Sequence, residues 1–205
     1  MNITKLSRAL MGTAAAGLVL AGCGAATETA PTGAGAPGSS SAGQTAHNDA
    51  DIAFAQGMAV HHQQAVEMAE LAAGRSQNPQ LLDLAARIGA AQGPEIETMN
   101  AWLEEWGAEM PAGRMGQGGM EGMEGMEGMG GMMTPEQMTQ LEQASGAEFD
   151  RLFLEMMTEH HMGAVEMAQT ELAEGSDPRA TELAQTIIDT QQDEISEMEG
   201  LLTQV

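Results

Sequence analysis

The amino-acid sequence predicts an all-α protein, a four-helix bundle made of two repeated helical hairpins joined by a long Gly- and Met-rich connection. Strand-forming patterns are nearly absent, whereas the helix formers Ala, Leu, Glu, Gln and Met dominate. Residues 54–103 also align without a gap with residues 153–202, which indicates one supersecondary unit used twice. Two hairpins of equal length close most simply as a bundle of four helices.

The first copy contains signals for two helices. We expect one over residues 49–73 that stops at Gly74, because glycine weakens a helix. The second should follow the Asn78 N-cap and its adjacent proline, and should end near Trp106. A Gly-Pro pair at residues 93–94 predicts a bend inside this helix.

The second copy adds a short helix before its own two. Thr-Pro-Glu-Gln, beginning at Thr134, is a capping box that predicts this lead-in helix. The third main helix should follow Gly146 and run to about residue 173. Asp177 and the proline after it repeat the N-cap signal, and the fourth helix should end near Leu202.

The connection over residues 107–133 repeats Gly, Met and Glu. Nine of the nineteen methionines lie between Met110 and Met138. Glycine at this density prevents a stable helix, so the segment should either cross the bundle end to end or hang free as a loop. We interpret it as a low-affinity segment for acquiring metal. The alternatives are low-complexity drift and a sink for oxidants at methionine.

The N-terminus predicts a lipoprotein signal. Lys5 and Arg8 precede an apolar stretch over residues 9–20 that is too short to span a bilayer. The following Leu-Ala-Gly-Cys resembles the lipobox of bacterial lipoproteins, which implies cleavage before Cys23 and acylation of its thiol. We therefore expect this only cysteine to anchor the protein to the outer face of the cytoplasmic membrane.

These signals divide the chain into three parts. We expect a signal peptide over residues 1–22, a disordered tether over 23–48 and a bundle domain over 49–205. Within the domain, repeat one covers 49–106, the Met-rich linker 107–133 and repeat two 134–203. The net charge of −23 argues against nucleic acid as a partner and favours cations.

Four of the five histidines form two adjacent pairs at the same place in each copy. On a helix, the pairs share one stripe, about 120° wide, with nearby methionines. Buried imidazoles without a partner are costly, so the repeated pairs predict a metal site at mid-bundle. The candidate metal ligands are His61, His62, His160, His161, Met58, Met68, Met157 and Met167.

The ligand types favour copper, and Cu(I) in particular. Imidazole with thioether is a soft set, whereas zinc and iron usually recruit thiolate or carboxylate. A di-iron or di-manganese oxidase is a further alternative, but no histidine of the repeats has a Glu three residues before it. A third alternative is a metal-free structural or interaction module of the envelope. No setting for nucleophilic catalysis is visible, so we do not expect an enzyme.

Several other residues are weaker candidates for a role at the metal site. Glu67 and Glu166 should lie opposite the stripe, on a solvated face. Glu95 and Glu194 could orient the histidines or form other buried polar contacts. We expect His47 to be exposed in the tether. Two further methionines, Met99 and Met198, should serve packing only.

The histidine motif, H-H-x-x-A-V-E-M-A after a Phe and a Met, resembles the signature of the domain of unknown function 305 family. The pattern Q-x-x-E-I-x-x-M-x-x-W-L over residues 92–103 resembles it as well. The resemblance covers about residues 49–203 and implies a ferritin-like four-helix bundle, usually secreted or lipid-anchored in bacteria. Because some members are similar to periplasmic copper-binding proteins, it implies the same eight His and Met ligands. Leu201 replaces the tryptophan found at Trp102 in the first copy, a departure that affects packing.

Together these observations predict a lipid-anchored extracytoplasmic protein that binds copper for sequestration, tolerance or delivery. The metal ion would be its main partner, and the membrane would be contacted only through the lipid.

Overall fold

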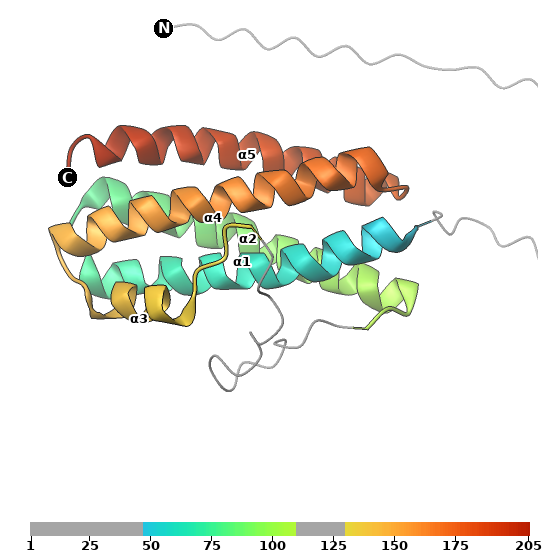
Figure 1. Ribbon diagram of the computed structural model, residues 1–205, viewed down its shortest axis with the longest axis horizontal. Coiled ribbons are helices and arrows are strands. Elements are labelled where there is room, and N and C mark those ends of the chain that lie inside the picture. Colours follow the sequence, from blue (N-terminus) through green and yellow to red (C-terminus); the bar gives the residue numbers. More distant parts are fainter. Residues whose placement is uncertain (1–46, 110–129) are drawn as a thin grey trace, which may run out of the picture. The chain divides into compact units, whose positions relative to one another are not determined.

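The protein is all-helical throughout the described residues, 47–109 and 130–205 of the computed structural model (Figure 1). The all-α prediction is confirmed, since the described residues contain five helices and no strand. The helices are α1 (Asp49–Arg75), α2 (Pro79–Trp106), α3 (Pro135–Gln143), α4 (Ala147–Glu174) and α5 (Pro178–Leu202).

Most of the predicted helix ends are confirmed by their caps. The side chains of Asn78 and Asp177 accept from the first backbone N–H groups of α2 and α5, and Thr134 forms a capping box with Gln137. At the other end of α2, Gly107 adopts a φ of 67°, the left-handed conformation that closes a helix at little steric cost to glycine.

The predicted stop of the first helix at Gly74 is wrong. The helix α1 continues through Gly74 to Arg75 and ends at the Ser76 cap. One glycine costs a helix only about 1 kcal/mol, and the last turn is held from outside. The Arg75 carbonyl accepts from the backbone N–H of Gly146 at 2.8 Å, and its guanidinium donates to the Glu142 carbonyl at 2.7 Å.

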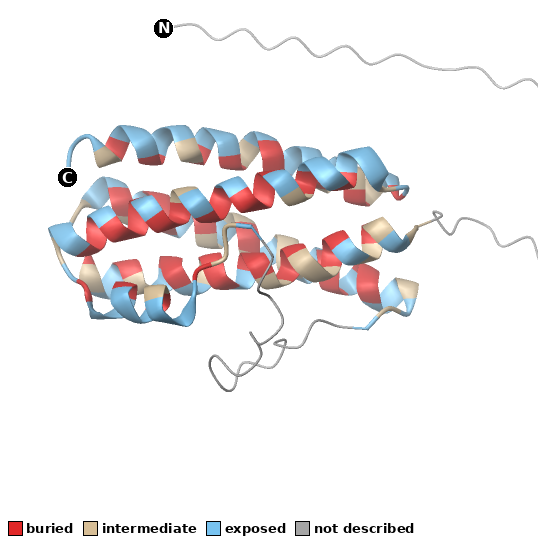
Figure 2. Ribbon diagram, viewed as in Figure 1, coloured by how far each residue is buried: buried red, intermediate tan, exposed pale blue. Residues whose placement is uncertain are grey.

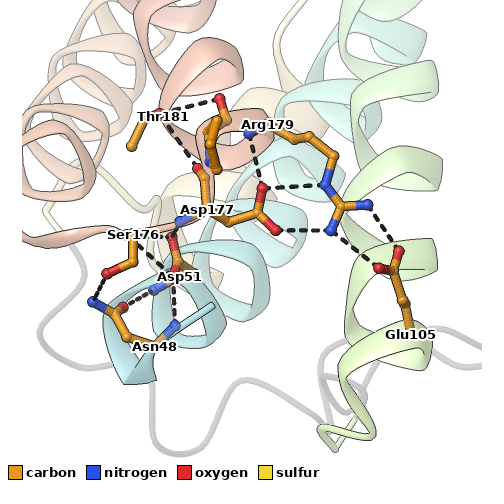
Figure 3. A network of polar contacts seen from close by, with 8 residues as sticks. Asn48, Asp51, Glu105, Ser176, Asp177, Arg179 and Thr181 are labelled. Atoms are coloured by element: carbon orange, nitrogen blue, oxygen red, sulfur yellow. Dashed lines mark hydrogen bonds and ion pairs between the residues drawn. The ribbon is translucent and has the colours of Figure 1, made fainter. Parts of the chain in front are cut away.

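Two helical hairpins, α1–α2 and α4–α5, pack with α1 antiparallel to α4. The start of α1 lies at the end of α4, where Asn48 donates to the Glu174 carbonyl at 2.8 Å. Asp51 accepts from the backbone N–H groups of Ser176 at 3.0 Å and Asp177 at 2.9 Å, as Figure 3 shows. This antiparallel pairing brings the middles of α1 and α4 together.

The same corner of the molecule is tied to α2. Arg179 bridges the buried Asp177 at 2.7 Å and Glu105 of α2 at 2.8 Å (Figure 3). Its guanidinium also lies over the ring of Trp102. The expectation that His47 is exposed is wrong, because it is half-buried and its ring stacks on Trp106 with centroids 4.9 Å apart. A neighbouring aromatic face therefore covers the histidine that precedes α1.

Each of the four long helices carries buried residues along one side and exposed residues along the other (Figure 2). They form two apolar clusters, one around Phe149 and Phe153 and one around Phe54 and Trp102. Methionine fills much of both clusters, since aromatic residues make up 2% of the chain. Met99 and Met198 are fully buried, as expected of packing residues.

Several sequence predictions lie outside the described residues. These are the signal peptide over 1–22, acylation at Cys23, the tether up to residue 46 and residues 110–129 of the Met-rich linker. Among the described helices, none combines the length and apolar character needed to cross a membrane.

Candidate metal centre

The two histidine pairs meet where α1 and α4 cross. The ring centroids of His61 and His160 are 3.7 Å apart, with the rings tilted by 40°. His62 and His161 complete the group, and none of the four side chains has exposed surface. We call these four residues the histidine layer. Its position at mid-helix, between the two apolar clusters, agrees with the sequence prediction.

Two carboxylates hold the outer histidines in related ways. The Nε2 of His62 lies 2.8 Å from Oε2 of Glu95, and the Nε2 of His161 lies 2.8 Å from Oε2 of Glu194. A carboxylate oxygen accepts from an imidazole N–H, so this geometry places a proton on each Nε2, and neither Nδ1 has a hydrogen-bond partner among the described residues. Of the two sequence alternatives for these glutamates, orientation of the histidines is therefore the one that the geometry favours.

The two histidines that contact each other, His61 and His160, make fewer hydrogen bonds. His61 Nε2 donates to the Gly130 carbonyl at 3.3 Å, whereas neither ring nitrogen of His160 has a hydrogen-bond partner among the described residues. The Nδ1 atoms of His61, His62 and His161 also lack one. A buried polar atom without a partner costs about 1–3 kcal/mol, so five of them in one layer point to a missing ligand.

Burial lowers the pKa of three histidines of this layer, His61, His160 and His161. The pKa of His61 is lowered to about 3, mainly by desolvation and also by the neighbouring His62, against the effect of the Gly130 bond. The pKa of His160 is also well below its usual value because of burial and the nearby His61. Burial lowers the pKa of His161 although Glu194 acts in the opposite direction. Neutral imidazole is the form that binds metal, so little proton competition is expected at these three residues at neutral pH.

The methionines of the stripe divide into two groups. Met58 and Met157 each lie one helical turn before a histidine pair, and both are fully buried beside the layer. Met68 is equally buried, but it lies about 10 Å along α1 from His61 and belongs to the cluster around Phe153.

The stripe predicts equal burial for Met167, and this prediction is wrong. Met167 is half-buried and lines an apolar cavity of about 330 Å³ with Phe54 and Glu171. The cavity exists because α1 presents the small residues Ala53 and Gly57 at this level. The position of Met167 is remote from the histidine layer, and its role as a ligand remains a prediction.

The remaining geometry limits how an ion could be held. Within the described ranges, no three His, Cys, Asp or Glu side chains converge on one point as they stand. An ion in the histidine layer would therefore need a thioether among its ligands or a rotation of an imidazole. Glu67 and Glu166 are exposed, as predicted, although the Glu166 carboxylate lies close to Gly130.

Sequence reasoning missed the chain that crosses this layer. Residues 130–133 run over α1 and α4 (yellow in Figure 1), and Gly130 bonds to His61. A signal for this contact is present inside the histidine motif, where the two copies differ two residues after the second histidine. Gln64 of the first copy is replaced by Gly163 in the second, and both residues contact this crossing segment.

The family of domains of unknown function DUF305 matches residues 51–202 of the chain. The chain is also similar to two solved DUF305 structures. A Streptomyces coelicolor protein described as secreted is 33% identical, with a TM-score of 0.65 over 76% of this chain and 93% of that chain. A Deinococcus radiodurans fragment is 31% identical, with a TM-score of 0.66 over 77% and 98%.

CopM is a further similar structure. Its Cu(II)-bound form is 31% identical, with a TM-score of 0.61 over 75% of this chain and 96% of CopM. Its Cu(I)-bound form gives 29% identity and a TM-score of 0.60 over the same shares. CopM has also been solved with silver and in the apo form. A comparison with curated proteins finds no match.

Proposed function

The chain belongs to the DUF305 family, and on this premise we propose that it is an extracytoplasmic protein that binds copper through its histidine layer. One observation carries the proposal: five buried imidazole nitrogens lie within one layer and have no hydrogen-bond partner among the described residues. The similarity to CopM, solved with Cu(I), Cu(II) and silver, supports copper as the ion.

The donor set favours Cu(I). Neutral imidazoles of the histidine layer and the thioethers of Met58 and Met157 make a soft site without thiolate. Thioether has no proton to lose and survives in an oxidising compartment, where a thiolate would not. The carboxylates of Glu95 and Glu194 would orient two of the imidazoles from behind. Any metal bound by Met68 or Met167 would be a separate ion.

We further propose a ferritin-like four-helix bundle anchored by a lipid at Cys23, with no enzymatic activity. The antiparallel packing of two repeated hairpins supports the bundle. The role in the cell would be sequestration, tolerance or delivery of copper. The Met-rich linker would gather ions at low affinity before they reach the histidine layer.

Titration of the purified protein with Cu(I) under a competing chelator tests the proposal. We expect stoichiometric binding and a rise in the unfolding temperature, since a ligand at 100 times its Kd stabilises the folded state by about 2.7 kcal/mol. Zn(II) and Ni(II) should stabilise less. Unchanged thermal stability with all three metals would instead favour a metal-free module of the envelope.

The glutamates behind the histidines give a second prediction. Glu95→Gln and Glu194→Gln should each weaken Cu(I) binding about 10- to 100-fold, because the amide is a poorer acceptor and no longer raises the basicity of the imidazole. Competition titration measures the change. Glu97→Gln, at an exposed position of α2, is the matched control and should leave the affinity unaltered.

A further inference from the structure

The segment Gly130–Met133, here called the strap, is fastened to α1 by one side chain. The amide of Gln64 donates to the Met133 carbonyl at 2.9 Å and accepts from the Met133 backbone N–H at 2.7 Å. Both hydrogen bonds are buried. Because one amide satisfies both backbone groups of Met133, the strap has a defined register on the helix.

The other end of the strap requires glycine in α4. A Cβ atom at Gly163 would lie 1.8 Å from the Gly130 carbonyl oxygen and 2.9 Å from the Gly131 Cα. Backbone atoms on both sides make this approach, so no side-chain rotation could relieve it. Gly131 itself has a φ of 81°, a conformation that suits glycine. The contact therefore depends on glycines from two segments.

The strap makes the two halves of the histidine layer unlike each other. Gln64 and Gly163 occupy the same position of the two copies, three residues after the first histidine. One fastens the strap and the other makes room for it. As a result, Gly130 reaches His61, while the equivalent His160 has no such acceptor.

We propose that the strap is a positioning element, which fixes His61 with its proton on Nε2 and so leaves Nδ1 for an ion. A carbonyl oxygen only accepts, so a bond from His61 Nε2 to Gly130 requires that tautomer. With His62 and His161 held the same way by their glutamates, three of the four histidines present Nδ1. The part concerning the ion rests on the proposed copper function; the tautomer does not.

The tautomer is tested first in the metal-free protein, by ¹⁵N NMR of the imidazole nitrogens. In the wild type, the Nε2 of His61 should carry the proton. Gly163→Ala should displace the strap and abolish this preference at His61 alone, because His62 and His161 keep their carboxylate partners. Gly89→Ala is the matched control, a glycine inside α2 with open space around its Cβ position, and should change nothing.

Two outcomes would overturn the proposal: His61 protonated on Nδ1 in the wild type, or a tautomer in Gly163→Ala that matches the wild type. If Gly163→Ala fails to fold, Gln64→Leu releases the other end of the strap and should have the same effect on His61.

The ion is tested separately with Ag(I), a diamagnetic substitute for Cu(I). On titration, the Nδ1 resonance of His61 should shift while its Nε2 keeps its proton. Binding of silver through Nε2 would contradict the positioning role and leave the copper function standing. No silver binding, with the predicted tautomers present, would contradict the copper function and leave the positioning of His61 standing.

Discussion

Replacing all four residues of the histidine layer by alanine should abolish stoichiometric copper binding. We expect the affinity for Cu(I) to fall at least 100-fold, about 2.7 kcal/mol, because the thioethers that remain are weak donors without the imidazoles. Equilibrium dialysis followed by metal analysis measures the loss. His47→Ala is the matched control, since that histidine stacks on Trp106 away from the layer and should leave binding intact.

Variants of single pairs then separate one shared site from two independent ones. The 3.7 Å contact of His61 with His160 joins the α1 and α4 pairs. Removing either pair should therefore cost most of the binding, and circular dichroism should confirm that the helices remain. Retention of half the copper by each variant would mean that each helix binds its own ion. Wild-type uptake by the variant lacking all four would end the copper proposal.

The second large effect concerns the buried carboxyl group of Glu171, away from the histidine layer. Burial raises its pKa to about 8, with further contributions from a hydrogen bond to Asp51 and from the charges of Asp51 and Asp177. Burial also acts to raise the pKa of Asp51, but backbone N–H groups of Asp177 and Asn48 outweigh it and lower that pKa. Glu171 is therefore protonated and Asp51 ionised at neutral pH.

Because the pKa of Glu171 is higher in the folded chain than in the unfolded chain, this group makes the fold more stable at low pH than at high pH. The folded chain binds more protons than the unfolded chain between the unfolded pKa of 4.5 and the folded pKa of about 8. The stabilisation is complete below the first value and is lost as the pH rises through the second. In the apoprotein, the free energy of unfolding should fall by about 2 kcal/mol between pH 6.5 and pH 9.

Glu171→Gln should remove this dependence, because the amide can donate to Asp51 and has no proton to lose. Urea unfolding at pH 6.5 and pH 9 measures it, and the difference between the variant and the wild type isolates the contribution of Glu171. Between pH 6.5 and pH 9 the wild type should lose about 2 kcal/mol of stability, whereas the variant should lose none of this contribution. Glu174→Gln, an exposed carboxyl on the same helix, should follow the wild type. Equal pH dependence in Glu171→Gln and the wild type would refute the role of this carboxyl.

Local signals in the sequence were sufficient to predict the helices and the burial of the histidine pairs. Caps such as Asn78 and Asp177 act on backbone groups two or three residues away, and the stripe follows from the 3.6-residue period. The predicted helix end at Gly74 is wrong because contacts from Gly146 and Glu142 hold the last turn of α1. The ungapped repeat also implied two similar hairpins, and therefore two histidine pairs at the same height.

Only the tertiary structure decided what each histidine contacts. The partners of His62 and His161 lie 33 residues away, and the Gly130 carbonyl lies 69 residues from His61. Such contacts depend on how the helices cross, which no local period encodes. The repeat even misleads here, because Glu171 corresponds to Ala72 and Gly163 to Gln64. The sequence by itself determined a pair of buried imidazoles on each of two helices; the packing of those helices and the course of the strap decided which ring nitrogens have a hydrogen-bond partner and which do not.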